Sequence, residues 1–296
     1  MALDTAHYHG WHGKLHSPWI GCLAIVRVAL LQVFRRKAYW AVIALGGLHF
    51  LLCWALIYVD TQLAGFSNFR GEVLKAFDFV VHPTPDRESG YVEFMWRQSI
   101  VVMILLAFSG SLLVGADFRM NSLPFYLSRR VDRRHYIVGK LLAVSSLISL
   151  LTIVPALLLF FEYGMFTANF DYWIDNWRLP LGVLGYGFIL CAVMSTLVVT
   201  LSAYLQRTAP IAITWSTLFV MLGTMSGQLR RFWENEYWRL LDPWQDMKLV
   251  GRLCFDTYKK PYERDLAWWA LAIVVGVCSL SIVLLMHRVR AVEVVE

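Results

Sequence analysis

Long apolar runs alternate with short polar segments along almost the whole chain. Six runs hold about 20 mostly apolar residues each, which is the length an α-helix needs to cross the hydrocarbon core of a bilayer. Away from their ends, these runs contain no Asp, Glu, Lys or Arg. The pattern predicts an all-α integral membrane protein with six transmembrane helices. They are expected at Tyr39–Val59, Gln98–Ala116, Gly139–Phe161, Leu179–Tyr204, Ala209–Leu229 and Leu266–Met286.

The apolar segment that precedes these runs, residues 18–37, is shorter and carries Arg27 near its middle. We expect it to form an amphipathic helix that lies in the membrane interface, with the basic residues at 35–37 facing lipid phosphates. The alternative is a seventh span. The remaining boundaries are a polar tail at 1–17, a six-helix domain at 38–287 with loops at 117–138 and 230–265, and a second tail at 288–296.

Composition and charge agree with a membrane protein and set its orientation. Hydrophobic residues make up 58% of the chain and charged residues 16%, against about 45–50% and about 25% in soluble domains. Lys and Arg gather before the first predicted helix, in loop 117–138 and in the final tail, and such residues favour the cytoplasmic side. We therefore expect both termini in the cytoplasm of a bacterial cell. Loop 230–265 has eight basic and seven acidic residues, and we expect it outside.

Motifs for chemistry are missing from the sequence. It contains no GxxxxGK[ST], HExxH or GxSxG, and its five cysteines form no CxxC pair. We expect no catalytic, cofactor or metal site, and no nucleotide bound by this chain. His49 is the one ionisable residue inside a predicted span, and we interpret it as a helix–helix hydrogen-bonding residue. The missing buried carboxylates also argue against an ion-driven secondary transporter.

Three weaker patterns leave alternatives open. The histidines of the N-terminal tail could bind a transition metal, although a plain polar tail is the simpler interpretation. The acidic residues of loop 230–265 could belong to a membrane enzyme that acts on lipids. Gly223 and Gly227 form a GxxxG pattern, which predicts close helix packing and an interface between two chains. The histidines of the tail are His7, His9, His12 and His16, and the acidic residues of the loop are Glu234, Glu236, Asp242 and Asp246.

Loop 117–138 has the most distinctive sequence. Asp117 ends the second predicted helix, a short apolar core follows between flanking arginines, and Gly139-Lys140 opens the third helix. With Ser122-Leu123 and Leu127-Ser128 between them, these residues resemble the first cytoplasmic loop of ABC-2-type transporter permeases. Arg130 stands where that family often has Pro.

The resemblance implies a function. It implies the membrane subunit of an ATP-binding-cassette transporter, and most transporters of this family are exporters. The expected partners are a cytoplasmic ATPase that binds ATP, a second permease chain and membrane lipids, with no nucleic acid. The resemblance makes the loop a coupling helix that sits in a groove of the ATPase. A membrane anchoring subunit that transports nothing is the alternative. The coupling residues would be Leu123, Phe125, Tyr126, Leu127, Arg129, Arg130, Arg133 and Arg134.

Overall fold

The computed structural model describes residues 17–62, 88–120, 122, 132–167, 171–258 and 260–289, and the elements within them are helical. Six segments are long and apolar enough to cross a membrane, which confirms the six predicted helices. Each extends beyond its predicted ends, so several charged residues fall inside them. The segments are Lys37–Gln62, Gly90–Arg119, Arg133–Phe166, Arg178–Leu205, Thr208–Trp233 and Tyr262–Arg288.

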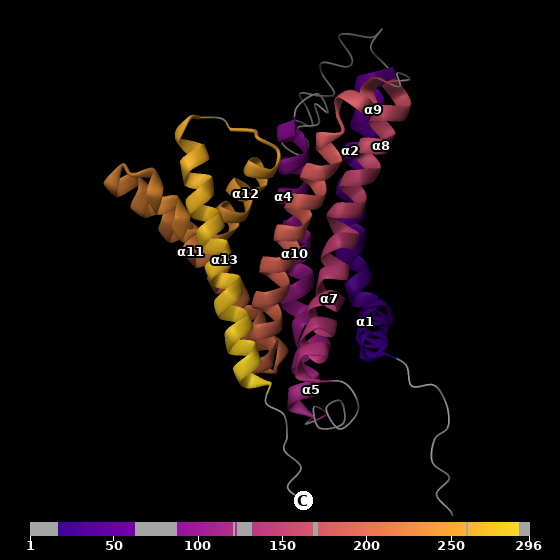
Figure 1. Ribbon diagram of the computed structural model, residues 1–296, viewed down its shortest axis with the longest axis vertical. Helices are drawn as coiled ribbons and strands as arrows, with labels where there is room; N and C mark the ends of the chain where they lie inside the picture. The colour runs from indigo at the N-terminus through magenta and orange to yellow at the C-terminus, as the bar shows by residue number, and fades with distance from the viewer. Residues whose placement is uncertain are drawn as a thin grey trace, which may run out of the picture.

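The elements follow one another in a simple order along the chain (Figure 1). The helices before the long basic loop are α1 (Pro18–Phe34), α2 (Lys37–Gln62), α4 (Glu88–Gly110), the π-helix η1 (Ser111–Gly115) and α5 (Ala116–Arg119). The helices after it are α7 (Arg133–Leu151), α8 (Ile153–Thr167), α9 (Asp171–Asp175), α10 (Arg178–Leu205), α11 (Thr208–Trp233), the 3₁₀-helix η2 (Glu236–Leu241), α12 (Pro243–Cys254) and α13 (Tyr262–Arg288).

The third span is broken between α7 and α8. Pro155 has no N–H to donate, and its ring crowds the carbonyl of Leu151, where α7 ends. Thr152 sits at the break with φ −117° and ψ −62°, and its hydroxyl donates to the Ile148 carbonyl at 2.7 Å. The proline therefore divides one membrane span into two helices.

The helices α4, α7 and α10 lie in the middle of the bundle, with α2 and α8 on one side and α11 and α13 on the other (Figure 1). We call the end with α1, α5 and the start of α7 the loop end, and the end with α9 and α12 the far end. Close approach depends on glycine at the far end. A Cβ at Gly182 would lie 2.6 Å from the Phe255 ring, and one at Gly251 would lie 2.8 Å from Tyr186.

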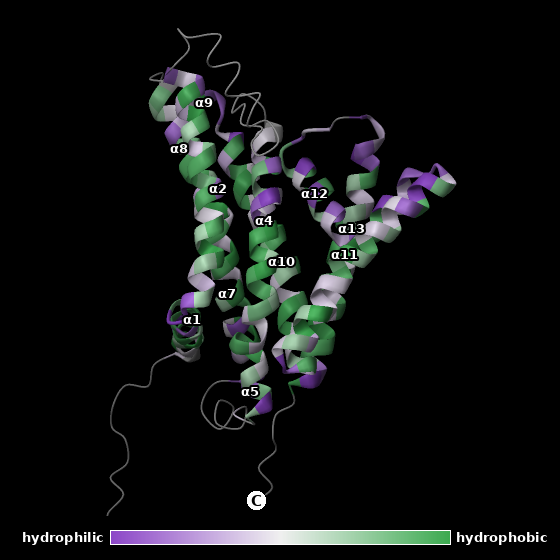
Figure 2. Cartoon of the chain, turned by 180° about the vertical axis from the view of Figure 1, so that it is seen from behind, coloured by the Kyte–Doolittle hydropathy of each residue, from purple (hydrophilic) through white to green (hydrophobic). Residues whose placement is uncertain are grey.

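The outer surface of the bundle is apolar over most of its length. Figure 2 shows hydrophobic residues along the long helices and hydrophilic ones toward their ends. Large apolar side chains such as Leu48, Phe188 and Val283 are exposed on it. Water would make so large an apolar surface unfavourable, whereas lipid chains solvate it. The surface therefore fits a protein that crosses a membrane several times.

Helix α1 runs across the direction of the long helices. Both Figure 1 and Figure 2 show it nearly end-on, beside the loop end of α7. Cys22, Ile25, Ala29 and Val33 form its buried face against the bundle, and Arg27 is exposed. The predicted helix at 18–37 is thus present from Pro18 to Phe34.

Segment 230–265 is more than the predicted loop, because much of it folds into helices that pack against the bundle. The Asp242 side chain accepts a hydrogen bond from the Trp244 N–H at 2.9 Å, and Pro243 follows it, so α12 begins with a capped N-terminus. Helix α12 lies among α4, α10, α11 and α13. Residues 246–252, charged ones included, are buried there. Sequence hydropathy missed this helix because its basic residues, Lys248 and Arg252, pair with acidic residues inside the protein.

Candidate functional site at the loop end

Asp117 contacts two buried residues of α7, and these contacts join the two ends of the basic loop. The Lys140 Nζ lies 2.6 Å from Asp117 Oδ2, and the Tyr136 hydroxyl donates to the same oxygen at 2.8 Å. Asp117 closes the span before the loop, whereas Tyr136 and Lys140 lie in α7 after it. We call these three residues the loop clamp. It fixes the distance between the two ends of segment 117–138.

Helix η1 completes the clamp. The Lys140 Nζ also donates to the Leu113 carbonyl at 2.5 Å, and Lys140 is only 5% exposed. In a π-helix the hydrogen bonds reach one residue further than in an α-helix, and here the Ala116 N–H bonds to the Ser111 carbonyl. A buried ion pair is tolerated when further hydrogen bonds satisfy its partners, as they do here.

The π-helix also contacts the turn between α10 and α11. A Cβ on Gly115 would lie 2.8 Å from the Gln206 carbonyl oxygen, so only glycine fits between the two backbones. The Ser111 hydroxyl lies 2.6 Å from the Thr208 hydroxyl. Gln206 adopts a left-handed conformation with φ 59° where α10 ends. The loop clamp is therefore in contact, through η1, with the hairpin of α10 and α11.

Helix α1 packs on the other side of the loop's return. The Cys22 thiol donates to the His135 carbonyl at 3.2 Å, and the Trp19 ring meets the His135 ring edge-on at 4.8 Å. Ile25 lies 3.2 Å from the position of a Cβ on Gly139. The two residues of the Gly-Lys pair named in the sequence analysis thus have separate roles. The glycine allows α1 to pack closely against α7, and the lysine forms an ion pair with Asp117.

Most of the predicted coupling residues, Leu123 to Arg130, lie outside the described residues. So do the N-terminal histidines, with their predicted metal alternative. Arg133 and Arg134 are described, and they form the exposed first turn of α7. The sequence named Asp117 and Lys140 as motif positions, but it did not predict that they pair.

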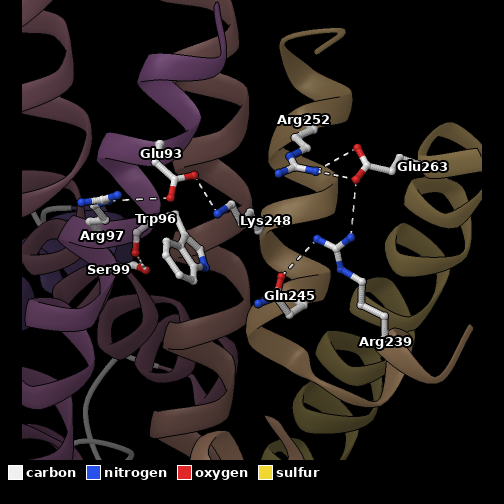
Figure 3. A network of polar contacts seen from close by, with 9 residues as sticks. All are labelled: Glu93, Trp96, Arg97, Ser99, Arg239, Gln245, Lys248, Arg252 and Glu263. Carbon is white, nitrogen blue, oxygen red and sulfur yellow. Dashed lines mark hydrogen bonds and ion pairs between the residues drawn. The ribbon is translucent and has the colours of Figure 1, made fainter. Parts of the chain in front are cut away.

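A second group of buried charges holds α12 at the far end (Figure 3). The Lys248 Nζ lies 2.6 Å from Glu93 Oε2 and 3.8 Å above the Trp96 ring, which joins α12 to α4. Arg252 donates to both oxygens of Glu263 at 2.8 Å, which joins α12 to α13. Both bonds come from one guanidinium nitrogen, Nη1, and they are charge-assisted, which makes them stronger than neutral hydrogen bonds. The network therefore anchors the inserted helix on two sides.

The four acidic residues considered for a lipid enzyme do not form one cluster. Asp242 and Asp246 are buried at the start of α12, whereas Glu234 and Glu236 line a separate pocket of about 350 Å³ with Asp265. Burial and the nearby Asp242 raise the pKa of Asp246 to about 8, and burial also raises the pKa of Asp242. Asp242 caps α12 and Asp246 lies in its first turn, so the two residues have a structural use in the fold.

The two glycines of the GxxxG pattern have different surroundings. A Cβ on Gly223 would lie 3.2 Å from the Asp242 carboxylate, so this glycine admits α12 within the same chain. Among the described residues, nothing lies within 4 Å of such an atom on Gly227. The predicted interface between two chains remains a prediction, for which Gly227 is the better placed residue.

The expectation that His49 is the one ionisable residue inside a span is wrong. The spans are longer than predicted, and Lys140 and Glu162 are buried within the third of them. Glu162 directly follows Phe161, where the predicted span ended. The argument against ion coupling from missing buried carboxylates therefore fails. The apolar residues on both sides of Glu162 were the signal that could have revealed it.

Comparison with known proteins adds no family. No protein-family model matches the chain, and no curated protein matches its sequence.

Proposed function

We propose that this chain is the permease subunit of an ATP-binding-cassette transporter of the ABC-2 type, and that the transporter is an exporter. The observation that carries the proposal is the loop clamp, in which Asp117 and Lys140 bind each other at 2.6 Å. These are the residues by which the loop resembles that family. The six apolar spans and the transverse direction of α1 support the same proposal.

The proposed mechanism is mechanical. An ATPase that binds the apolar core of segment 117–138 would push on a loop whose two ends are tied together. Because the ends cannot separate, the displacement passes to α7 through Lys140 and to η1 through Leu113. Through Gly115 and Ser111 the π-helix presses on the turn at Gln206. In this mechanism η1 is the hinge between the loop and the α10–α11 hairpin.

The proposal also sets partners and orientation. The loop end faces the cytoplasm, with both termini there and α1 in the lipid interface. ATP binds to the ATPase subunits, and a second permease chain packs against this one near Gly227. Single cysteines labelled from one side of the membrane test the orientation. Position 128 should react from the cytoplasmic side and position 89 from the outside, and reaction of both from one side contradicts the proposed topology.

The coupling role is tested by co-purification of this chain with a cytoplasmic ABC ATPase. The double change Phe125→Ala with Leu127→Ala removes two apolar side chains from the loop, each worth about 1.5–3 kcal/mol when buried. We expect the variant to insert normally but to lose ATPase co-purification or transport-coupled hydrolysis. Leu280→Ala with Val283→Ala, on the exposed face of α13, is the matched control and should keep both.

Charge reversal at Arg129 separates contact with the partner from contact with lipid. Charges at the rim of an interface affect association more than affinity, and salt screens them. We expect a smaller loss of ATPase binding than in the double variant, and we expect the loss to fade as salt is raised. If the double variant keeps wild-type ATPase association and transport, the loop is not a coupling helix.

A further inference from the structure

A line of buried polar groups runs between α2, α4 and α8 toward the far end, and Glu162 of α8 belongs to it. Glu162 is 0% exposed, and within the part of the chain that the structure describes neither of its carboxyl oxygens has a hydrogen-bond partner. Charged residues elsewhere in the spans, such as Lys140 and Asp117, are paired. Glu162 differs from them because its charge would have nothing to balance it.

Buried titratable groups of α2 and α4 interact with Glu162. Cys53 of α2 and Tyr91 of α4 are both buried, and both interact electrostatically with Glu162. Tyr91 also interacts with Tyr163 of α8 and Tyr172 of α9. Thiols and phenols are neutral at ordinary pH. They can donate hydrogen bonds to a carboxyl group, but they bring no positive charge to it.

The charged groups further away already have partners. Arg97 interacts with Cys53, but its Nε lies 3.7 Å from Glu93 Oε1. Glu93 in turn binds Lys248 at 2.6 Å. Among the described residues, no cation forms an ion pair with Glu162.

The cost of burying an unpaired charge decides what this site binds. An ionised carboxylate in an apolar interior is unfavourable by many kcal/mol, and uptake of a proton removes that cost. Carboxyl groups buried inside membrane helices commonly mark proton or ion pathways. We propose that Glu162 is a proton-binding site, which holds a proton at neutral pH and exchanges it with the far end of the bundle.

A second proton acceptor lies beyond Cys53. The Gln98 side-chain nitrogen donates to the Gly46 carbonyl at 3.0 Å, so its oxygen faces His49 Nδ1 at 2.7 Å and accepts from it. This leaves His49 Nε2 as an acceptor, 3.9 Å from the Cys53 sulfur. His49 also lines a groove of about 470 Å³ between α2 and α4. Cys53 therefore interacts both with Glu162 and with a histidine that borders this groove.

Infrared difference spectroscopy tests the proposal on the full chain in nanodiscs of neutral lipid. A protonated carboxyl group has a carbonyl stretch that is separate from the bands of carboxylates. We expect such a band in the wild type at neutral pH, weakened in Glu162→Gln, where buried Asp246 still contributes to it, and kept at full strength in Glu234→Gln, which alters an exposed acid on the same side. Equal bands in the wild type and Glu162→Gln at neutral pH overturn the proposal.

A repeat in buffer with choline in place of sodium distinguishes a proton from a metal cation. If the part of the band that Glu162→Gln removes is present in both buffers, the proton site is supported. A band that appears only when sodium is absent shows that the site binds a cation instead, which also overturns the proposal.

Thermal unfolding against pH gives an independent check. Glutamine resembles the protonated acid in shape, so Glu162→Gln should fold. As pH rises above the ordinary range of a glutamate, the unfolded chain loses this proton, whereas the folded wild type keeps it. The free energy of unfolding of the wild type should therefore fall with rising pH, relative to that of the variant. A difference that does not change with pH contradicts the proposal. Neither experiment involves an ATPase, so their outcomes do not depend on the proposed permease function.

Discussion

Replacing Lys140 by Met tests the loop clamp most directly. The change keeps the length and apolar stem of the side chain but removes its charge, and with it the contacts to Asp117 and Leu113. Removing one partner of a buried ion pair costs about 3–5 kcal/mol, because the other charge stays buried and unpaired. The Asp117 side chain is 15% exposed and keeps its bond from Tyr136, so we expect the lower end, about 3 kcal/mol.

The assay is a double-mutant cycle on the free energy of unfolding in bicelles. Asp117→Asn removes the other charge, and the double variant should cost clearly less than the sum of the two single changes. Arg134→Met, in the exposed first turn of the same helix, is the matched control and should stay within about 0.5 kcal/mol of wild type. Additive effects, or a loss below about 1 kcal/mol for Lys140→Met, would refute the clamp.

Three further changes test the far end. The free energy of unfolding of the wild type should fall as pH rises from about 4 to about 8, because folding moves the pKa of Asp246 from 3.8 to about 8. The fall is bounded by roughly 6 kcal/mol. Asp246→Asn should remove it, and thermal unfolding at several pH values measures the difference. Gly251→Ala should cost about 1–3 kcal/mol by overpacking a buried tyrosine, whereas Gly276→Ala, in open space, should be neutral or stabilising in the same assay. Glu263→Gln should lower the unfolding temperature by leaving both Arg252 and Arg239 without their carboxylate, and Arg252→Met combined with Glu263→Leu should recover only part of the loss, because Arg239 still lacks its partner.

The membrane class of the protein could be predicted from sequence because a span needs about 20 apolar residues in a row. That requirement is local, so it can be counted along the chain. The ends of the spans could not be predicted equally well. Charged residues such as Asp117 and Lys140 lowered the hydropathy there, although in the fold they neutralise each other.

Partnerships between distant residues decided most of the candidate sites. Lys248 and Arg252 look like residues of an exposed loop, but Glu93 and Glu263 pair with them inside the protein. Hydropathy scores each residue alone and cannot register such pairs. The same limit hid α12, because its charged residues count as polar although they are buried.

The sequence by itself determined that the chain is helical, crosses a membrane six times and carries a basic loop with a recognisable beginning and end. These properties depend on the order of residues within about 20 positions. Only the tertiary structure decided that the ends of the loop are clamped to a π-helix, and that Glu162 is buried with no partner among the described residues. Both depend on which side chains from distant helices share one low-dielectric interior, where an unpaired charge is unfavourable and a paired one is tolerated.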